Sequence, residues 1–336
     1  MLLLLAVTSP ALAADSPASN LLVDTLARVQ PKMVKIYGAG GLAGLEHYQS
    51  GFLISPDGAI LTIWSHVLDT DEITAVLADG RKCAAKLAGA DPRLEIAVLK
   101  IAAADLPCFD LAGAVEVDAG SRVLALSNLF NVAEGNELAS VQHGTISVKT
   151  RLEARRGAFD TPYNGPVYAL DVVTNNPGAA GGALVTWHGD LVGVLGKELR
   201  NSLNNTWFNY ALPIAELRKS VDEIRAGKFV IRPPEEAAKK PARALSATML
   251  GLVLVPDILE RTPPYVDEVL PDSPAAKAGV QPDDLIVLVE NRLTPSCKTF
   301  RNELAYVDYE DKVKLTVLRA QQMLEFVLQA AENKKP

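Results

Sequence analysis

Short runs in which apolar and polar residues alternate fill most of the first two thirds of the chain. Met33–Tyr37, Ala59–Ile63 and Ile96–Ile101 each have the pattern of a strand, and the turn at residues 78–80 indicates a hairpin. Many short strands with no helix between them favour an all-β barrel. The first series continues to 122–126, and a second series follows at 144–148, 167–171, 182–187, 191–196 and 208–212. Two series of strands in succession predict two barrels packed side by side.

Helical spacing is found at both ends of this region. Residues 20–29 carry apolar side chains at helical spacing behind a cap at Asn20 or Ser19, and Pro31 ends the helix. Residues 213–225 have a proline at the predicted first position and an apolar face of Leu217, Val221 and Ile224.

The chain changes character after this second helix. Residues 232–241 are rich in charge and proline, which is typical of an extended, solvated linker. The remaining chain has its own strands and a helix-like segment at residues 273–279. We therefore expect a cleaved leader at 1–14, the double barrel at 20–227, the linker at 228–246 and a small second domain at 247–331.

The first residues resemble a secretory leader. Their apolar core is too short to span a bilayer, which takes about 20 residues, and it ends in the cleavage-like Ala11-Leu12-Ala13. The first basic residue is Arg28, so either the start codon is misassigned or the α-amino group alone supplies the positive charge. These features predict a periplasmic or secreted protein.

Charge and cysteine content narrow the function classes. The net charge of −7 argues against a nucleic-acid-binding face. Cys83 and Cys108 could form a disulfide and leave Cys297 unpaired, or all three could be thiols. His47, His66, His143 and His188 lack metal-ligand spacing, so we expect neither a metal nor a cofactor.

A glycine-rich turn at residues 175–184 is the most informative stretch. Three glycines and a proline within six residues let the backbone turn its amides toward one point, which suits a carbonyl or an oxyanion. Such turns usually present a nucleophile. Here the presented side chain is the methyl group of Ala180.

This turn resembles the Pro-Gly-Asn-Ser-Gly-Gly turn of the trypsin-like HtrA/Deg serine protease family, with Ala179 and Ala180 in place of Asn and Ser. Residues 62–67 are similar to the family's Thr-x-x-His-Val, which implies that His66 is the general base. Residues 91–100 are similar to Asp-Pro-x-x-Asp-Ile-Ala-x-Leu-Lys, with Glu95 at the orienting aspartate. The order His66, Glu95, Ala180 is that of the chymotrypsin-like triad, and the fold implied is a trypsin-like double β-barrel.

The resemblance implies a degenerate triad. Removing a serine nucleophile lowers turnover about 10⁶-fold in a worked protease system. Ser65 would point away from its neighbour His66 on a strand, and nothing aims Thr174, Thr186 or Ser202 at His66. His66 is then either a working base or a partly buried remnant. The amides of Gly178 and Ala180 resemble the oxyanion hole, although the glycines could serve the turn alone.

The C-terminal domain resembles the PDZ domains of the same family. Residues 270–286 are close to the family's Pro-x-Ser-Pro-Ala-x-x-Ala-Gly-Leu-x-x-Gly-Asp-x-Ile, with Asp283 at the usual glycine. The resemblance implies a carboxylate-binding loop, a facing helix near residues 297–304, and a peptide that adds as a strand, unless the groove is closed. The loop residues are Leu250, Gly251, Leu252 and Val253.

These features predict an exported HtrA/Deg-like protein that lacks proteolytic activity. It would bind unfolded or C-terminal peptides in protein quality control, as a chaperone, adaptor or decoy. One alternative is an active serine-type endopeptidase with a non-standard nucleophile, and another is an assembly scaffold. By analogy with the family we expect a homo-oligomer, such as a trimer.

Overall fold

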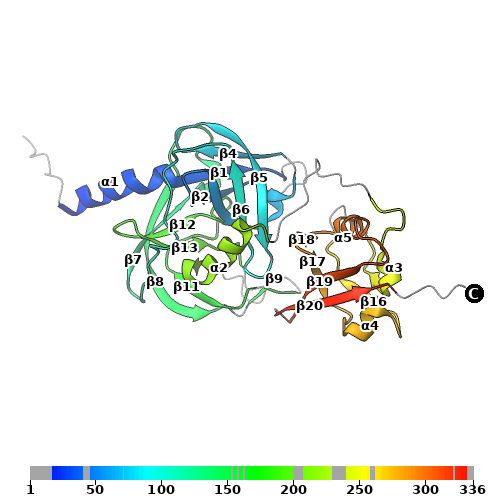
Figure 1. The fold of residues 1–336 in the computed structure, drawn as a ribbon. Coiled ribbons are helices and arrows are strands. Elements are labelled where there is room, and N and C mark those ends of the chain that lie inside the picture. The colour runs from blue at the N-terminus through cyan, green and yellow to red at the C-terminus, as the bar shows by residue number, and fades with distance from the viewer. Residues whose placement is uncertain are drawn as a thin grey trace, which may run out of the picture.

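In the computed structural model, the structure describes residues 17–40, 46–70, 72–152, 154–156, 159–161, 163–199, 207–228, 240–257, 262–320 and 322–330. Two closed barrels of six strands lie beside a smaller domain (Figure 1). The predicted leader and most of the predicted linker lie outside the described residues, and the domain boundaries stay predictions.

The first barrel has the strand order β1-β2-β3-β6-β5-β4, with every neighbouring pair antiparallel. All five residues of β3 are buried, in keeping with its continuous apolar run. The strands are β1 Met33–Tyr37, β2 Tyr48–Leu53, β3 Ala59–Ile63, β4 Ile73–Leu77, β5 Lys82–Asp91 and β6 Ile96–Ile101.

The second barrel has the order β11-β14-β13-β12-β7-β8. β8 is longer than predicted because its second half is exposed and polar, so it pairs with β11 without an alternating pattern to reveal it. The prediction of two barrels is confirmed, but the assignment of 122–126 to the first series is wrong, because this strand pairs with β12 and β8 in the second barrel. Its strands are β7 Arg122–Ser127, β8 Ser140–Arg151, β11 Pro166–Leu170, β12 Ala183–Thr186, β13 Leu191–Leu195 and β14 Tyr210–Pro213, and β9 Arg155–Arg156 pairs with β10 Phe159–Asp160.

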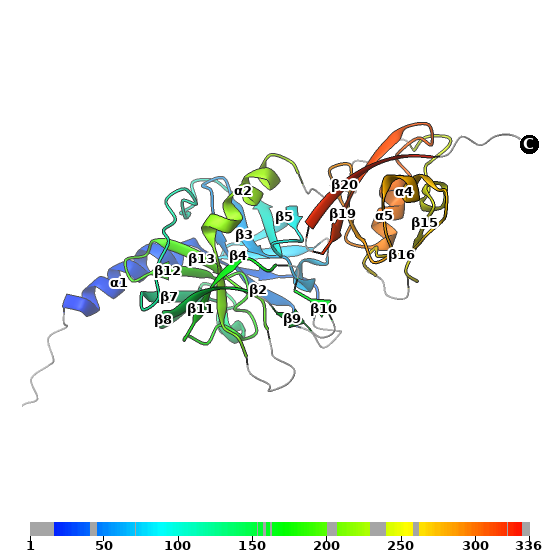
Figure 2. The same ribbon diagram turned by 90° about the horizontal axis from the view of Figure 1, so that it is seen from below.

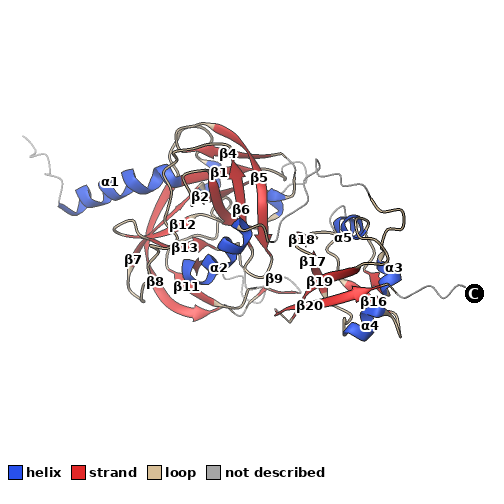
Figure 3. Cartoon of the chain, in the orientation of Figure 1, coloured by secondary structure: helices blue, strands red, loops and turns tan. Residues whose placement is uncertain are grey.

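Within the described residues, two α-helices and three short 3₁₀ helices accompany the strands and loops of the barrels (Figure 3). α1 Pro17–Val29 begins earlier than predicted, and its second half is tied to the turn after β12 by Arg28, whose Nη2 donates to the His188 carbonyl at 2.8 Å. α2 Ile214–Arg225 contacts both barrels and buries the predicted apolar face. Pro213 is the cap residue and not the first helical residue, because it still pairs within β14.

The C-terminal domain contains a four-stranded sheet with the order β18-β17-β19-β20 and a separate β15-β16 pair. Phe300, Leu304 and Leu315 lie in its own core. Its elements are α3 Ala247–Leu250, β15 Leu252–Leu254, β16 Val266–Val269, α4 Pro274–Ala278, β17 Leu285–Val289, β18 Arg292–Leu293, α5 Cys297–Leu304, β19 Lys312–Arg319 and β20 Gln322–Gln329.

The sheet of this domain faces the barrels. Figure 2 shows β19 and β20 between the barrels and the helices α4 and α5. Leu288 and Leu293 belong to the same buried apolar cluster as the barrel core, and Met323 packs against it. None of the helices in the described ranges is long and apolar enough to cross a membrane.

Candidate functional site

The glycine-rich turn immediately before β12 requires glycine at two positions. Gly178 and Gly181 have φ angles of +82° and +83°, a region that side chains disfavour. A Cβ at Gly178 would collide with the Asn128 carbonyl oxygen and lie 2.7 Å from the Tyr48 ring. These glycines therefore fix the shape of the turn through the neighbours that crowd them.

The backbone amides of the turn divide into two groups. The N–H groups of Ala179, Gly181 and Gly182 donate to protein carbonyls, each at 3.0 Å. Within the described residues, the N–H groups of Gly178 and Ala180 have no acceptor. These two are the amides that the sequence singled out as a candidate oxyanion hole. Gly178 is buried and Ala180 is half-buried.

Ser50 on β2 holds this turn against the first barrel. Its hydroxyl donates to the Gly178 carbonyl at 2.6 Å and accepts from the Asn128 amide at 2.7 Å. Its own amide donates to the Ala180 carbonyl at 3.0 Å. Sequence reasoning missed Ser50, although a polar residue beside Phe52 and Leu53 in a buried strand is a signal of such a role.

His66 lies at the start of the short 3₁₀ helix His66–Leu68, just beyond β3. Its ring is exposed, so the expectation of partial burial is wrong: the chain leaves β3 at Ile63 and carries the ring out of the barrel. The ring Nε2 lies 2.7 Å from the Glu46 carbonyl oxygen. A carbonyl oxygen only accepts, so Nε2 carries the proton.

This arrangement is the reverse of what a serine triad needs. In a working triad, Nδ1–H donates to the carboxylate and Nε2 stays unprotonated to accept the proton of the nucleophile. With Nε2 donating to the Glu46 carbonyl, the neutral His66 ring has no lone pair at Nε2. His66 is therefore not set as a general base in this structure.

Glu95 lies in the turn between β5 and β6. It has a φ angle of +53° and is 7% exposed. Its Oε1 pairs with Lys197 Nζ at 2.7 Å, and its carbonyl accepts from the Trp64 amide at 2.8 Å. Among the described contacts no hydrogen bond joins its carboxylate to the His66 ring. The structure brings Glu95 close to the His66 segment but pairs it with a lysine.

Comparison with known proteins places this geometry in a family. A trypsin-like peptidase domain matches residues 49–194, and a PDZ domain matches residues 249–329. A probable periplasmic serine endoprotease DegP-like of Pseudomonas fulva is 31% identical over 263 residues, 78% of this chain and 51% of that protein. The corresponding protein of Chlamydia pneumoniae is 28% identical over 286 residues, 85% of this chain and 55% of that protein.

Solved structures of serine endoproteases are also similar to this chain. The serine endoprotease from Yersinia pestis is 25% identical with a TM-score of 0.51, covering 92% of this chain and 96% of that one. The HtrA-type protease AlgW with tripeptide is 26% identical with a TM-score of 0.50, covering 94% and 98%. The chain belongs to the HtrA/Deg family.

The predicted HtrA/Deg fold, a trypsin-like double barrel followed by a PDZ domain, is thus confirmed. The predicted periplasmic or secreted localisation agrees with the names of both relatives, which are called periplasmic. The chain spans about half the length of the curated relatives it matches.

Two of the hydroxyls considered as substitutes for the HtrA/Deg serine are engaged elsewhere. Ser65 caps the 3₁₀ helix rather than lying on a strand, and its hydroxyl donates to Gln49 Oε1. Thr174 is buried, and Thr186 donates to Asp190 Oδ2 at 2.9 Å in the turn after β12. Ser202 lies outside the described residues.

Tyr37 and Tyr48 flank the turn on the side of the first barrel. The Tyr48 ring is the one that excludes a side chain at Gly178. The Tyr37 hydroxyl donates to Asn131 Oδ1 at 2.6 Å, which ties β1 to the loop after β7. Burial raises the pKa of both phenols above the usual range.

The predicted carboxylate-binding segment of the PDZ domain spans the end of α3 and β15. Gly251 is left-handed at φ +79°, and its N–H donates to the Thr248 carbonyl at 3.1 Å. Leu250 and Leu252 are buried, whereas Val253 is half-buried. Across the described residues β15 pairs only with β16, so no strand occupies its other edge there.

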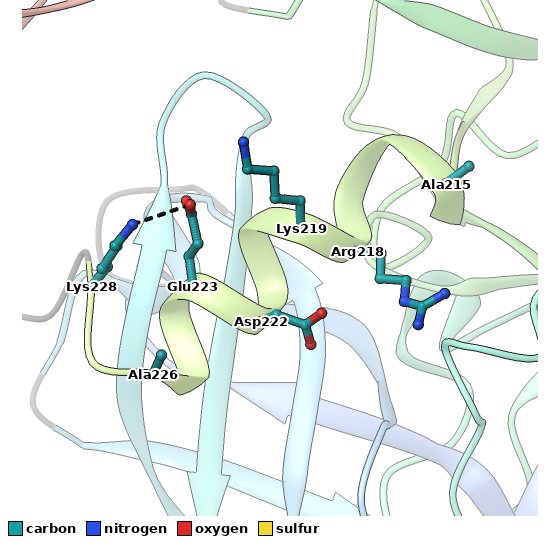
Figure 4. A pocket seen from close by; sticks show the side chains of 7 residues that line it. All are labelled: Ala215, Arg218, Lys219, Asp222, Glu223, Ala226 and Lys228. Atoms are coloured by element: carbon teal, nitrogen blue, oxygen red, sulfur yellow. Dashed lines mark hydrogen bonds and ion pairs between the residues drawn. The ribbon is translucent and has the colours of Figure 1, made fainter.

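Two hollows lie away from the triad positions. One, of about 580 Å³, follows α2 and includes the Glu223–Lys228 ion pair (Figure 4). The other, of about 630 Å³, lies between the barrels and the PDZ domain and includes Arg93 and Lys314.

Cys83, Cys108 and Cys297 are all free thiols, so the alternative of a Cys83–Cys108 disulfide is wrong for this structure.

Proposed function

We propose that this chain is a periplasmic HtrA/Deg-like protein that binds peptides without cleaving them. It would act in protein quality control as a chaperone, adaptor or decoy. The observation that carries the proposal is the methyl group of Ala180 at the head of a turn whose shape-determining glycines remain. A methyl group has no lone pair and forms no acyl-enzyme.

The state of His66 supports the loss of cleavage independently of Ala180. Its Nε2 donates to a backbone carbonyl, so a hydroxyl brought to the turn would meet a protonated nitrogen. The carboxylate of Glu95 is paired with Lys197. Two of the triad functions are therefore altered besides the missing nucleophile.

The amides of the turn support binding. The N–H groups of Gly178 and Ala180, which have no acceptor among the described residues, would donate to a peptide carbonyl or to a C-terminal carboxylate. Because Ser50 and Tyr48 already brace the turn, the amides would be held in place before the peptide arrives. Such preorganisation lowers the entropy lost on binding.

The PDZ domain supplies a second proposed binding element. The open edge of β15 would accept an extended peptide as an added strand. The HtrA-type protease AlgW was solved with a tripeptide, which makes a short peptide the natural first probe. The Gly251 amide already donates to Thr248, so a bound carboxylate would have to replace that bond or use the neighbouring amides.

The first test measures cleavage. We expect no casein turnover and no covalent labelling by a fluorophosphonate from the purified mature protein. A protein labelled stoichiometrically by the fluorophosphonate would instead be an active endopeptidase with a non-standard nucleophile, and the proposal would be wrong. Repurification and repeated labelling separate this outcome from a contaminating protease.

The second test measures binding. Fluorescent peptides with a free C-terminus are compared with the same peptides ending in a carboxamide. We expect the free carboxylate to bind at least tenfold more tightly, because it accepts charge-assisted bonds from backbone amides. Absence of binding to any peptide in a C-terminal library would favour an assembly scaffold. Sedimentation of the same sample measures whether the expected homo-oligomer forms.

A further inference from the structure

We propose that Lys197 is a positioning residue that disarms the barrel site independently of the missing serine. The inference rests on the proposed function, because it explains why the site would stay silent even with a nucleophile present. It concerns the pairing of Lys197 with Glu95, which joins the two barrels. Sequence motifs did not point to Lys197.

The ion pair is short and well shielded from water. Lys197 Nζ lies 2.7 Å from Glu95 Oε1, and the two side chains are 22% and 9% exposed. Glu95 belongs to the turn between β5 and β6, whereas Lys197 follows β13 in the other barrel. A pair with so little solvent around it is screened weakly, so the ammonium offsets most of the carboxylate charge.

Offsetting the Glu95 charge weakens the electrostatic support that a general base at His66 would need. When a histidine takes a proton from a serine, the carboxylate stabilises the imidazolium that forms. The Glu95 backbone carbonyl accepts from the Trp64 amide, two residues before His66, so this bond holds the Glu95 turn beside the segment that carries the ring. With Lys197 beside it, this position gives the imidazolium little electrostatic support.

The tautomer of the His66 ring agrees with this lack of electrostatic support. Its Nε2 donates to the Glu46 carbonyl, which leaves Nδ1 as the acceptor of the neutral ring. A carboxylate that is to orient the ring needs Nδ1–H instead. The structure therefore combines a neutralised carboxylate with the opposite tautomer, and a serine added at residue 180 would have no activating base.

The experiment uses full-length protein with Ala180→Ser as the common background. Casein turnover and the rate of fluorophosphonate labelling are measured for Ala180→Ser alone and with Lys197→Gln, Lys197→Arg or Lys228→Gln added. Lys228 is the matched control, since it forms an exposed ion pair with Glu223. Arginine keeps the charge, so Lys197→Arg should behave like Ala180→Ser.

We expect Lys197→Gln to raise the labelling rate of Ala180→Ser at least tenfold, and the other two changes to leave it unaltered. The unaltered rate expected of Lys197→Arg separates the effect of charge from a structural effect of the substitution, because arginine keeps the cation. Equal labelling rates with and without Lys197→Gln, including no labelling of either, overturn the proposal.

A second measurement does not depend on how the variants fold. The ¹⁵N signals of the wild-type His66 ring, assigned by their loss in His66→Gln, should show the proton on Nε2. A proton on Nδ1 overturns the proposal. Casein turnover and peptide binding of the wild type are measured separately, and the missing hydroxyl at Ala180 does not depend on the His66 tautomer, so failure of this inference is distinguishable from failure of the proposed function.

Discussion

The two barrels contribute to the candidate site in different ways. The second barrel supplies backbone: a turn whose glycines at 178 and 181 are confined by packed neighbours. The first barrel supplies side chains, and these have partners other than those a protease needs, since His66 donates to a carbonyl and Glu95 pairs with Lys197. Packing holds one half of the site, whereas the side chains of the other half have partners that differ from those of a working triad.

The difference has a physical cause. A side chain at Gly178 or Gly181 would collide with the strands beneath, so changing these residues would disturb the fold. Residues 66 and 180 are not confined in that way: the His66 ring is exposed and Ala180 is half-buried. Packing therefore constrains the turn independently of any role in cleavage.

The largest predicted effect is at the turn. Gly178→Ala should reduce the free energy of unfolding by about 3 kcal/mol or more, because it adds a steric collision to the 1–2 kcal/mol of a left-handed non-glycine residue. Trp64, Trp187 and Trp207 are the three tryptophans of the chain and all lie in the barrels, so their fluorescence in urea reports barrel unfolding.

Gly120→Ala is the matched control. Gly120 has a φ angle of +85° but nothing within 4 Å of its would-be Cβ. The Gly120→Ala variant should lose only about 1 kcal/mol of unfolding free energy, through backbone strain. Equal losses in the two variants would mean that packing does not confine the turn, and the contrast between the barrels would disappear.

The next effect concerns the brace between the barrels. Ser50→Ala removes the hydroxyl that bonds the Gly178 carbonyl and the Asn128 amide, leaving two buried groups without that partner. We expect a loss of about 2 kcal/mol and weaker peptide binding. Ser147→Ala, on the exposed part of β8, is the control and should change neither quantity. Unaltered peptide affinity in a destabilised Ser50→Ala would separate the brace from binding.

The next prediction concerns the dependence of stability on pH through the Tyr37 phenol. Because the pKa of Tyr37 is raised by burial, its contribution to stability is complete below about pH 10 and is lost as the pH rises through the raised value. Ionisation also removes the proton donated to Asn131. Wild type should therefore lose stability above pH 10 more steeply than Tyr37→Phe, measured by urea unfolding at pH 8, 10 and 11. If wild type and Tyr37→Phe lost the same unfolding free energy between pH 8 and pH 11, the prediction for Tyr37 would be wrong.

Most of the fold followed from local patterns. β1, β3 and β6 were predicted with their observed bounds because each is a short, mostly apolar run with a single polar or charged residue. The glycine-rich turn was found because its three glycines and its proline lie within six residues of the sequence. β8 was predicted too short, since the exposed residues after Val148 carry no apolar signal.

The state of the candidate site did not follow from the sequence. Glu95 was placed by its motif, but its pairing with Lys197 joins residues from different barrels that no local pattern connects. The bond from His66 to the Glu46 carbonyl involves a backbone atom, which any residue type supplies. Motifs identify the positions that match the family's triad, whereas long-range pairing decides which partners their side chains have.

The smallest predicted effect tests the comparison from the side of the first barrel. His66→Gln should change the free energy of barrel unfolding by no more than about 0.5 kcal/mol, because the ring is exposed and glutamine can also donate to the Glu46 carbonyl. His188→Gln, in the exposed turn after β12, is the matched control. A loss above about 1.5 kcal/mol at His66 alone would mean that packing holds this residue as it holds Gly178. The persistence of His66 would then need no functional cause, and the two halves of the site would be preserved for the same reason.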